Sequence, residues 1–127
     1  MNQKKILVID DDTDLREALQ TSMHSAGYDV LTAADGEGGL LSAFANKPDL
    51  ILLDISMPKM NGLQVLHTLR RDPWGKDVPV LLLTNADDPT NIVHGVEQKS
   101  NDYIIKSQTS LENILKKVKQ QLAGYHN

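Results

Sequence analysis

The sequence predicts an α/β fold in which five parallel strands form one doubly wound sheet, in the order 2-1-3-4-5, with five helices on its faces. The first observation behind this prediction is an alternation. Short β-branched or leucine-rich runs and segments of helical period follow one another five times, as in successive strand–helix units. The second is that the runs ILVI, LILL and VLLL are apolar throughout, as strands covered on both faces are. Right-handed crossovers leave few topologies for such a chain, and this strand order fits them best.

The expected strands are short, and their boundaries follow from where the apolar runs stop. They are Lys5–Ile9, Asp29–Ala33, Leu50–Leu53, Val80–Leu83 and Tyr103–Ile105. The second of these is the most polar, so we place it at an edge of the sheet, where one side of the strand meets water.

The expected helices carry apolar residues at steps of three and four. They cover residues 13–26, 36–45, 62–71, 89–98 and 110–123. Asp12 stands where an N-cap acceptor belongs, Asp14 lies in the first turn, where negative charge suits the helix dipole, and Gly27 follows as a C′ residue. The helix over 89–98 has the fewest apolar anchors, which suits an element that changes conformation.

Length and composition indicate a single domain, residues 1–127 with a core over 4–123 and no output domain after it. A net charge of -4 argues against nucleic-acid binding, which needs a basic face. The chain has no cysteine, so disulfides and thiolate metal sites are excluded. Its apolar runs are too short for a signal peptide or a membrane span. We therefore expect a cytoplasmic protein without a membrane or nucleic-acid partner.

Polar side chains stand at the carboxyl ends of four expected strands, where the sites of open α/β sheets form. Asp10 and Asp11 follow the first strand, Asp54 the third, Thr84 the fourth and Lys106 the fifth. Three carboxylates so close need a counter-charge, and oxygen ligands alone suit Mg²⁺, or Mn²⁺ as a second choice. We expect Asp11 and Asp54 to hold the cation, with Asp10 acting through a bound water.

This set of residues is suited to phosphoryl transfer. A carboxylate beside such a cation can attack phosphorus and become an acyl phosphate. The phosphoryl group then spreads negative charge over three oxygens, and the cation, Lys106 and the Thr84 hydroxyl can each take one of them.

Four segments in this order and spacing resemble the receiver domains of two-component response regulators, which have a flavodoxin-like (βα)5 fold. The segments are ILVIDDD, LILLDISMPKMNGLQVL, PVLLLT and DYIIK. The resemblance runs from Lys4 to about Ala123. It implies a phosphorelay protein that takes phosphate from a histidine kinase or a histidine phosphotransfer protein. It implies no enzyme activity beyond its own phosphorylation and dephosphorylation. Its output would be binding to a downstream protein through the face made by the helix over 89–98, the fifth strand and the last helix.

The resemblance also implies a role for each site residue. The implied roles are phospho-acceptor for Asp54; Mg²⁺ ligands for Asp10, Asp11, Asp54 and the main-chain carbonyl of Ser56; phosphoryl contacts for Thr84 and Lys106; switch residues for Thr84 and Tyr103; and control of access for Ser56, Asn85 and Ala86. In this scheme the Tyr103 ring turns inward when Thr84 is drawn to the phosphate. Met57-Pro58 and Gly62 shape the loop after the acceptor.

The chain departs from the family pattern at three places. Ser107 follows Lys106 where the family usually has a proline in a cis peptide, and a non-proline cis bond costs roughly 2.5–4 kcal/mol, so we expect a trans bond here. Asn85 stands where the family favours Ala or Gly, and could narrow access to the acceptor. Lys99-Ser100 replaces the usual Gly-Ala before the last strand.

Three alternatives to a phosphorylated receiver can be set beside it. A haloacid-dehalogenase-type phosphatase would use Asp10 as nucleophile and Asp12 as acid/base, although Asp14 stands where that motif has Thr or Val. An EF-hand fails because Leu15 replaces the required Gly and Thr21 the required Glu. A pseudo-receiver, folded but never phosphorylated, is kept open by the departures at positions 85 and 107.

Overall fold

Five parallel strands form one sheet in the order β2-β1-β3-β4-β5, which confirms the predicted topology. The structure is a computed structural model, and it describes residues 3–84 and 102–123. The strands are β1 (Lys5–Ile9), β2 (Asp29–Ala33), β3 (Leu50–Asp54), β4 (Val80–Thr84) and β5 (Asp102–Ile105). Three strands are one residue longer than predicted, because backbone pairing continues past the end of the apolar run.

The described part of the chain also contains four helices and one 3-10 turn. They are α1 (Thr13–Ser25), α2 (Gly36–Asn46), α3 (Gly62–Arg70), η1 (Lys106–Gln108) and α5 (Leu111–Leu122). The boundaries agree with the prediction within one residue at most ends. The helix predicted over 89–98 lies outside the described residues. No helix within the two described ranges is both long and apolar enough to cross a membrane.

The two ends of α1 are fixed as the sequence predicts. The Asp12 carboxylate accepts a hydrogen bond from the Leu15 N–H at 3.2 Å, so it serves as the N-cap. After the helix, Gly27 has φ of +97°, in the left-handed region that glycine adopts without steric cost, and its N–H donates to the His24 carbonyl.

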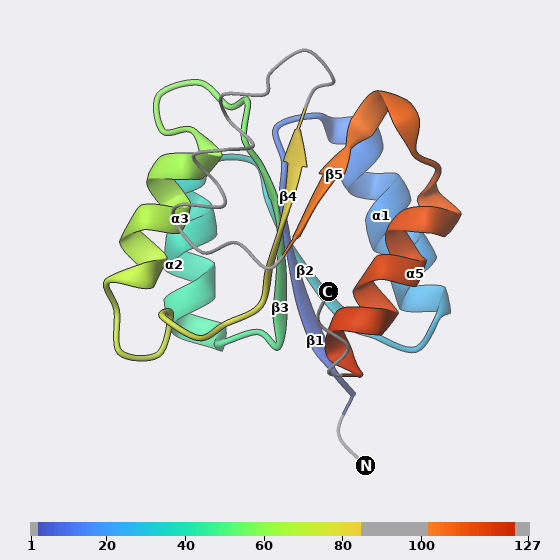
Figure 1. Ribbon diagram of the computed structural model, residues 1–127, viewed down its shortest axis with the longest axis horizontal. Helices are drawn as coiled ribbons and strands as arrows, with labels where there is room; N and C mark the ends of the chain where they lie inside the picture. The colour runs from blue at the N-terminus through green and yellow to red at the C-terminus, as the bar shows by residue number, and fades with distance from the viewer. Residues whose placement is uncertain (1–2, 85–101, 124–127) are drawn as a thin grey trace.

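Helices cover both faces of the sheet, with α2 and α3 on one face and α1 and α5 on the other (Figure 1). Successive strand residues alternate between these two layers. In β1, Leu7 and Ile9 pack toward α2 and α3, whereas Ile6 and Val8 pack toward α1 and α5. All residues of β3 and β4 are buried, while β2 at the edge is half-buried or exposed. The edge position predicted for β2 is therefore confirmed.

The loop between α3 and β4 is joined to the α2–α3 layer by side-chain hydrogen bonds and by the packing of Trp74. One carboxylate oxygen of Asp72 accepts the N–H groups of Trp74 and Gly75, both at 2.9 Å. Arg70 donates to the carbonyls of Gly75 and Val78 at 2.7 and 2.8 Å. Trp74 packs against the core, and its ring meets that of Phe44 edge to face at 6.2 Å.

Candidate functional site

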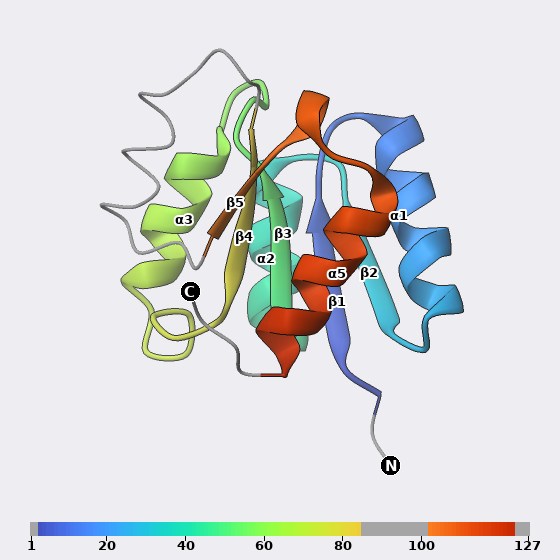
Figure 2. The same ribbon diagram turned by 45° about the vertical axis from the view of Figure 1, so that its right-hand side comes forward.

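The carboxyl ends of the parallel strands lie at one edge of the sheet (Figure 2), and strand register brings the predicted site residues together there. Ile9 pairs with Leu53, so the next residues, Asp10 and Asp54, lie side by side after adjacent strands. Asp54 is also the last residue of β3, which places its side chain at the rim. On the other flank Thr84 pairs with Ile105, and Lys106 follows directly.

The carboxylates of the site differ sharply in exposure. Asp10 is fully buried and Asp54 is 2% exposed, whereas Asp11 is exposed at the start of the β1–α1 loop. One oxygen from each of these three carboxylates lies within 4.8 Å of the others. The geometry therefore matches the acidic cluster predicted from the sequence, with two members fixed by the sheet and one by the loop.

Lys106 supplies the counter-charge. Its ammonium lies 3.0 Å from Asp10 Oδ2 and 3.2 Å from Asp54 Oδ1, so it bridges the two buried carboxylates. The residue begins the η1 turn directly after β5. No peptide bond of the described part is cis, which confirms the trans bond predicted between Lys106 and Ser107.

Crowding and burial shift the proton affinities of these groups. Burial first, and then the negative charge of Asp10, raise the pKa of Asp54 from its ordinary 3.8 to about 7, although Lys106 opposes the shift. Burial would lower the pKa of Lys106, but the carboxylates of Asp54 and Asp10 outweigh it and raise that pKa above its usual value. The raised pKa of Asp54 therefore means that the Lys106 ammonium does not offset the combined effect of burial and the Asp10 charge.

The donor set fits a hard divalent cation such as Mg²⁺. All three candidate side chains offer carboxylate oxygens, which are the ligands that this ion prefers. Asp10 Oδ2 is fully buried, and within the described part of the chain it accepts no hydrogen bond of regular geometry, so Lys106 alone compensates it. A buried carboxylate oxygen in this state is suited to a cation or to one of its water ligands.

The loop after β3 is tightly joined to the end of that strand. The Ser56 N–H donates to Asp54 Oδ1 at 3.2 Å, and the Gly62 N–H donates to the Ile55 carbonyl at 2.9 Å. A Cβ on Gly62 would lie 2.3 Å from the Asp54 carbonyl oxygen, so only glycine fits this close approach. Met57 is buried beneath the loop. The roles of the Ser56 carbonyl as a metal ligand and of its side chain in access stay predictions.

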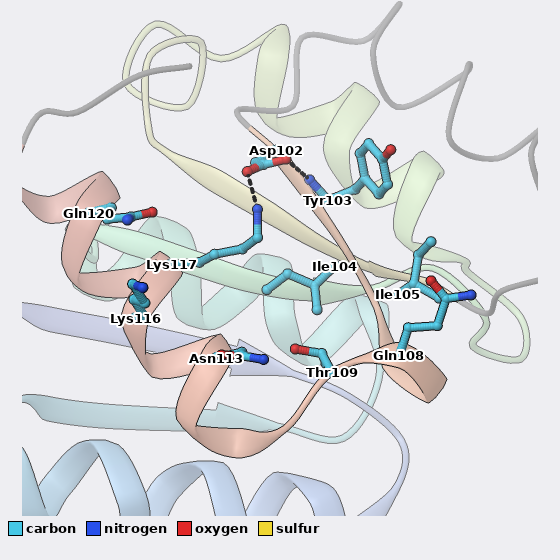
Figure 3. A pocket seen from close by; sticks show the side chains of 10 residues that line it. All are labelled: Asp102, Tyr103, Ile104, Ile105, Gln108, Thr109, Asn113, Lys116, Lys117 and Gln120. Carbon is cyan, nitrogen blue, oxygen red and sulfur yellow. Dashed lines mark hydrogen bonds and ion pairs between the residues drawn. The ribbon is translucent and has the colours of Figure 1, made fainter.

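The predicted switch residues lie on β4 and β5. Thr84 is 1% exposed at the end of β4, close to the acidic rim, and Tyr103 is 37% exposed near the start of β5. The Tyr103 ring points away from α5, whereas Ile104 points toward it (Figure 3). Asn85 and Ala86, the other residues predicted to control access, lie outside the described residues.

One residue that contacts the site was missed in the sequence. Arg16, in the first turns of α1, donates from Nη1 to the main-chain carbonyl of Asp10 at 2.7 Å. The signal was present, since a long cationic side chain stands six residues after the first aspartate, but nothing in the pattern says that it folds back. Asp12 has its own N–H bonded to Asp10 Oδ1 at 2.9 Å, while its carboxylate caps α1. That capping role speaks against Asp12 as the acid/base of a phosphatase.

Comparisons with known proteins agree with this geometry. The family model for the response regulator receiver domain matches residues 6–119. The chain is 43% identical over 103 residues to the alkaline phosphatase synthesis transcriptional regulatory protein PhoP of Bacillus subtilis, a match that covers 81% of the chain and 42% of PhoP. It is 40% identical over 106 residues to the probable transcriptional regulator ycf27 of Cyanophora paradoxa, covering 84% of the chain and 43% of that relative. The chain thus spans less than half the length of these curated relatives.

A solved structure of similar length agrees as well. The crystal structure of a putative response regulator from Chloroflexus aurantiacus superposes with a TM-score of 0.89 at 32% identity, covering 96% of this chain and 99% of the other.

Proposed function

Because the chain belongs to the response regulator receiver domain family, we propose that it is a phosphorylation switch whose phospho-acceptor is Asp54. The observation that carries this proposal is the placement of Asp54. Its carboxylate is almost fully buried, lies 3.2 Å from the Lys106 ammonium, and shares one cluster with Asp10 and Asp11.

In the proposed reaction an oxygen of the Asp54 carboxylate forms the new bond to phosphorus. The bond between phosphorus and the donor histidine nitrogen breaks, and the imidazole leaves with the electron pair. The Lys106 ammonium, already within 3.2 Å of the acceptor, is placed to pair with a phosphoryl oxygen. The Thr84 hydroxyl at the end of β4 would donate to another.

Asp10, Asp11 and Asp54 would hold Mg²⁺, with the Ser56 carbonyl as a further ligand. When bound, the ion would neutralise charge on the phosphoryl oxygens and on the crowded carboxylates. The chain's own part is to fix the acceptor, to exclude water from Asp10 and Asp54 by burial, and to supply the ammonium. This chemistry serves self-modification, as expected of a signalling domain rather than of an enzyme with a separate substrate.

The phosphoryl donor would be a histidine kinase or a histidine phosphotransfer protein, and the output would be binding of a downstream protein. We assign that output to the face that includes β5 and α5. Beside these two elements lies a cavity of about 480 Å³, lined by Tyr103, Asn113 and Lys116 among others (Figure 3). Lys117 reaches across to Asp102 at 2.7 Å and ties α5 to β5. A rotation of Tyr103 would change this surface directly. We also propose that the whole chain, residues 1–127, acts as one receiver domain.

The test is phosphorylation by a small phosphodonor in the presence of Mg²⁺, followed by intact-mass and peptide mass spectrometry. We expect one added phosphoryl group on the wild type, located on Asp54, and none on Asp54→Ala. Asp12→Asn is the matched control and should be labelled like the wild type. It changes another aspartate of the same acidic stretch, one whose side chain caps α1. A label on Asp10 would refute the assignment and favour the phosphatase. A folded wild type that stays unmodified would refute it and favour the pseudo-receiver.

A further inference from the structure

The turn that carries Asp11 is held by two hydrogen bonds that both end on Asp10. The Asp12 N–H donates to the Asp10 carboxylate at 2.9 Å, and Arg16 donates to the Asp10 main-chain carbonyl at 2.7 Å. The Asp10 N–H donates to the Ala33 carbonyl in the sheet at 3.1 Å, so the peptide before Asp10 is fixed by strand pairing. The peptide after Asp10, which leads into Asp11, has left the sheet.

Arg16 is well placed to fix that second peptide. Its own N–H donates to the Asp12 carbonyl at 2.9 Å, so the backbone of Arg16 is joined to the same turn that its side chain contacts. The side chain is half-buried, which restricts its rotamers. A hydrogen bond from a guanidinium to a carbonyl is charge-assisted and strongly directional. It therefore restrains the Asp10–Asp11 peptide, which leads directly into the backbone of Asp11.

We propose that Arg16 is a positioning residue of the metal site, which aims the Asp11 carboxylate at the cation by holding the Asp10 carbonyl. Of the three clustered carboxylates, Asp11 is the exposed one, so core packing does not orient it. Partners that orient metal ligands without touching the metal commonly contribute 10–100-fold to affinity, and we expect about 10-fold here. The inference rests on the proposed function, because it assumes that Asp11 binds Mg²⁺.

The proposal predicts a change in Mg²⁺ affinity opposite to the one that simple electrostatics predicts. Arg16 is a cation beside a cation site, so if it acted only through its charge, its removal would tighten Mg²⁺ binding. If it acts by positioning, Arg16→Met weakens Mg²⁺ binding although a positive charge is lost. Arg16→Lys keeps the charge but replaces the planar fork by a single ammonium on a different stem, so it too should weaken binding.

The experiment is calorimetric titration of Mg²⁺ into the folded wild type, Arg16→Met, Arg16→Lys and the control Arg71→Met, which removes the same charge at the exposed end of α3. We expect about 10-fold weaker binding in both Arg16 variants and less than about 2-fold change in the control. Binding to Arg16→Met as tight as to the wild type, or tighter, would overturn the proposal. If Arg16→Met does not fold, the same criterion applies to Arg16→Lys.

A second readout works without metal. The Asp11 amide nitrogen belongs to the peptide that Arg16 holds, so its NMR shift should move in metal-free Arg16→Met, and the Asp12 amide should exchange faster with solvent. Unchanged Asp11 and Asp12 amides would mean that Arg16 does not orient the turn, whatever the metal affinity does. A wild type that binds no Mg²⁺ at all would instead refute the proposed function. Where the wild type does bind, Asp11→Asn tests the premise, because it should lose affinity if Asp11 is a ligand.

Discussion

Replacing the proposed acceptor Asp54 by its neutral isostere, Asp54→Asn, should stabilise the metal-free protein at neutral and higher pH. Burial and the neighbouring Asp10 raise the pKa of the Asp54 carboxyl from 3.8 to about 7. A raised carboxyl pKa means that the folded chain binds the proton more tightly than the unfolded chain does. Stability from this group is therefore greatest below about pH 4, falls as the pH rises toward 7, and stays low above it.

The size of the effect follows from the same shift. At about 1.4 kcal/mol for each pH unit between the two pKa values, the ionised Asp54 would cost the fold at most about 4 kcal/mol. The substitution also removes the 3.2 Å contact with Lys106, which keeps its pairing with Asp10 at 3.0 Å. We therefore expect a net gain of about 1–3 kcal/mol, or roughly 4–11 °C in Tm for a chain of this length.

The assay is thermal unfolding of both proteins from pH 5 to 8, with a chelator and with Mg²⁺. With the chelator, the wild type should lose stability across this range relative to Asp54→Asn, and Mg²⁺ should narrow the gap because it stabilises only the fold that binds it. Titrating groups that do not contact Asp54 are common to both proteins and cancel in the difference. A mutant that is less stable than the wild type at pH 8 without metal would contradict the reasoning.

Three further substitutions test the support around the site. Gly62→Ala should destabilise the fold by about 2 kcal/mol or more, because its Cβ would lie 2.3 Å from the Asp54 carbonyl oxygen; urea unfolding measures this. Asp12→Ala should cost about 1 kcal/mol through the lost cap of α1, with Mg²⁺ affinity nearly unchanged in a calorimetric titration. Arg70→Met should cost about 1–3 kcal/mol by releasing two loop carbonyls, and the fluorescence of Trp74, the chain's single tryptophan, should shift to the red; an unshifted spectrum would mean that the loop does not need the arginine.

The fold was predictable because the apolar pattern and the strand ends carry the same information. Fully apolar runs marked β1, β3 and β4 as central, and a polar run marked β2 as an edge. The residues that end those runs, Asp10, Asp54 and Thr84, were then assigned to one rim by topology alone. Only single end residues of three strands were missed, the last of β3 and β4 and the first of β5, since hydrogen bonding between strands does not stop where hydrophobicity does.

The links between site residues were not predictable in the same way. The sequence indicates that Lys106 lies near Asp54, but it does not indicate that the ammonium also meets Asp10, because that depends on how far η1 turns back over the sheet. The same holds for Arg16, whose contact depends on a side-chain direction rather than on a periodic pattern. Trp74 is a third case: its neighbour Phe44 is thirty positions away, and their contact depends on how α2 sits beside α3.

The site has a buried half, in which the carboxylates are fixed, and an exposed half, in which the carboxylate is free to move. Asp10 follows β1, which is buried beyond Lys5, and Asp54 ends the fully buried β3, so their mutual repulsion is not relieved by local movement. Without metal, that repulsion destabilises the fold. A bound cation would relieve it, and the free energy gained in this way would add to the affinity for the cation. Asp11 is different, because it stands in water and could turn away at little cost. If Asp11 is a metal ligand, as proposed, its backbone has to be held in place, and the bond from Arg16 to the carbonyl of the Asp10–Asp11 peptide is placed to do this.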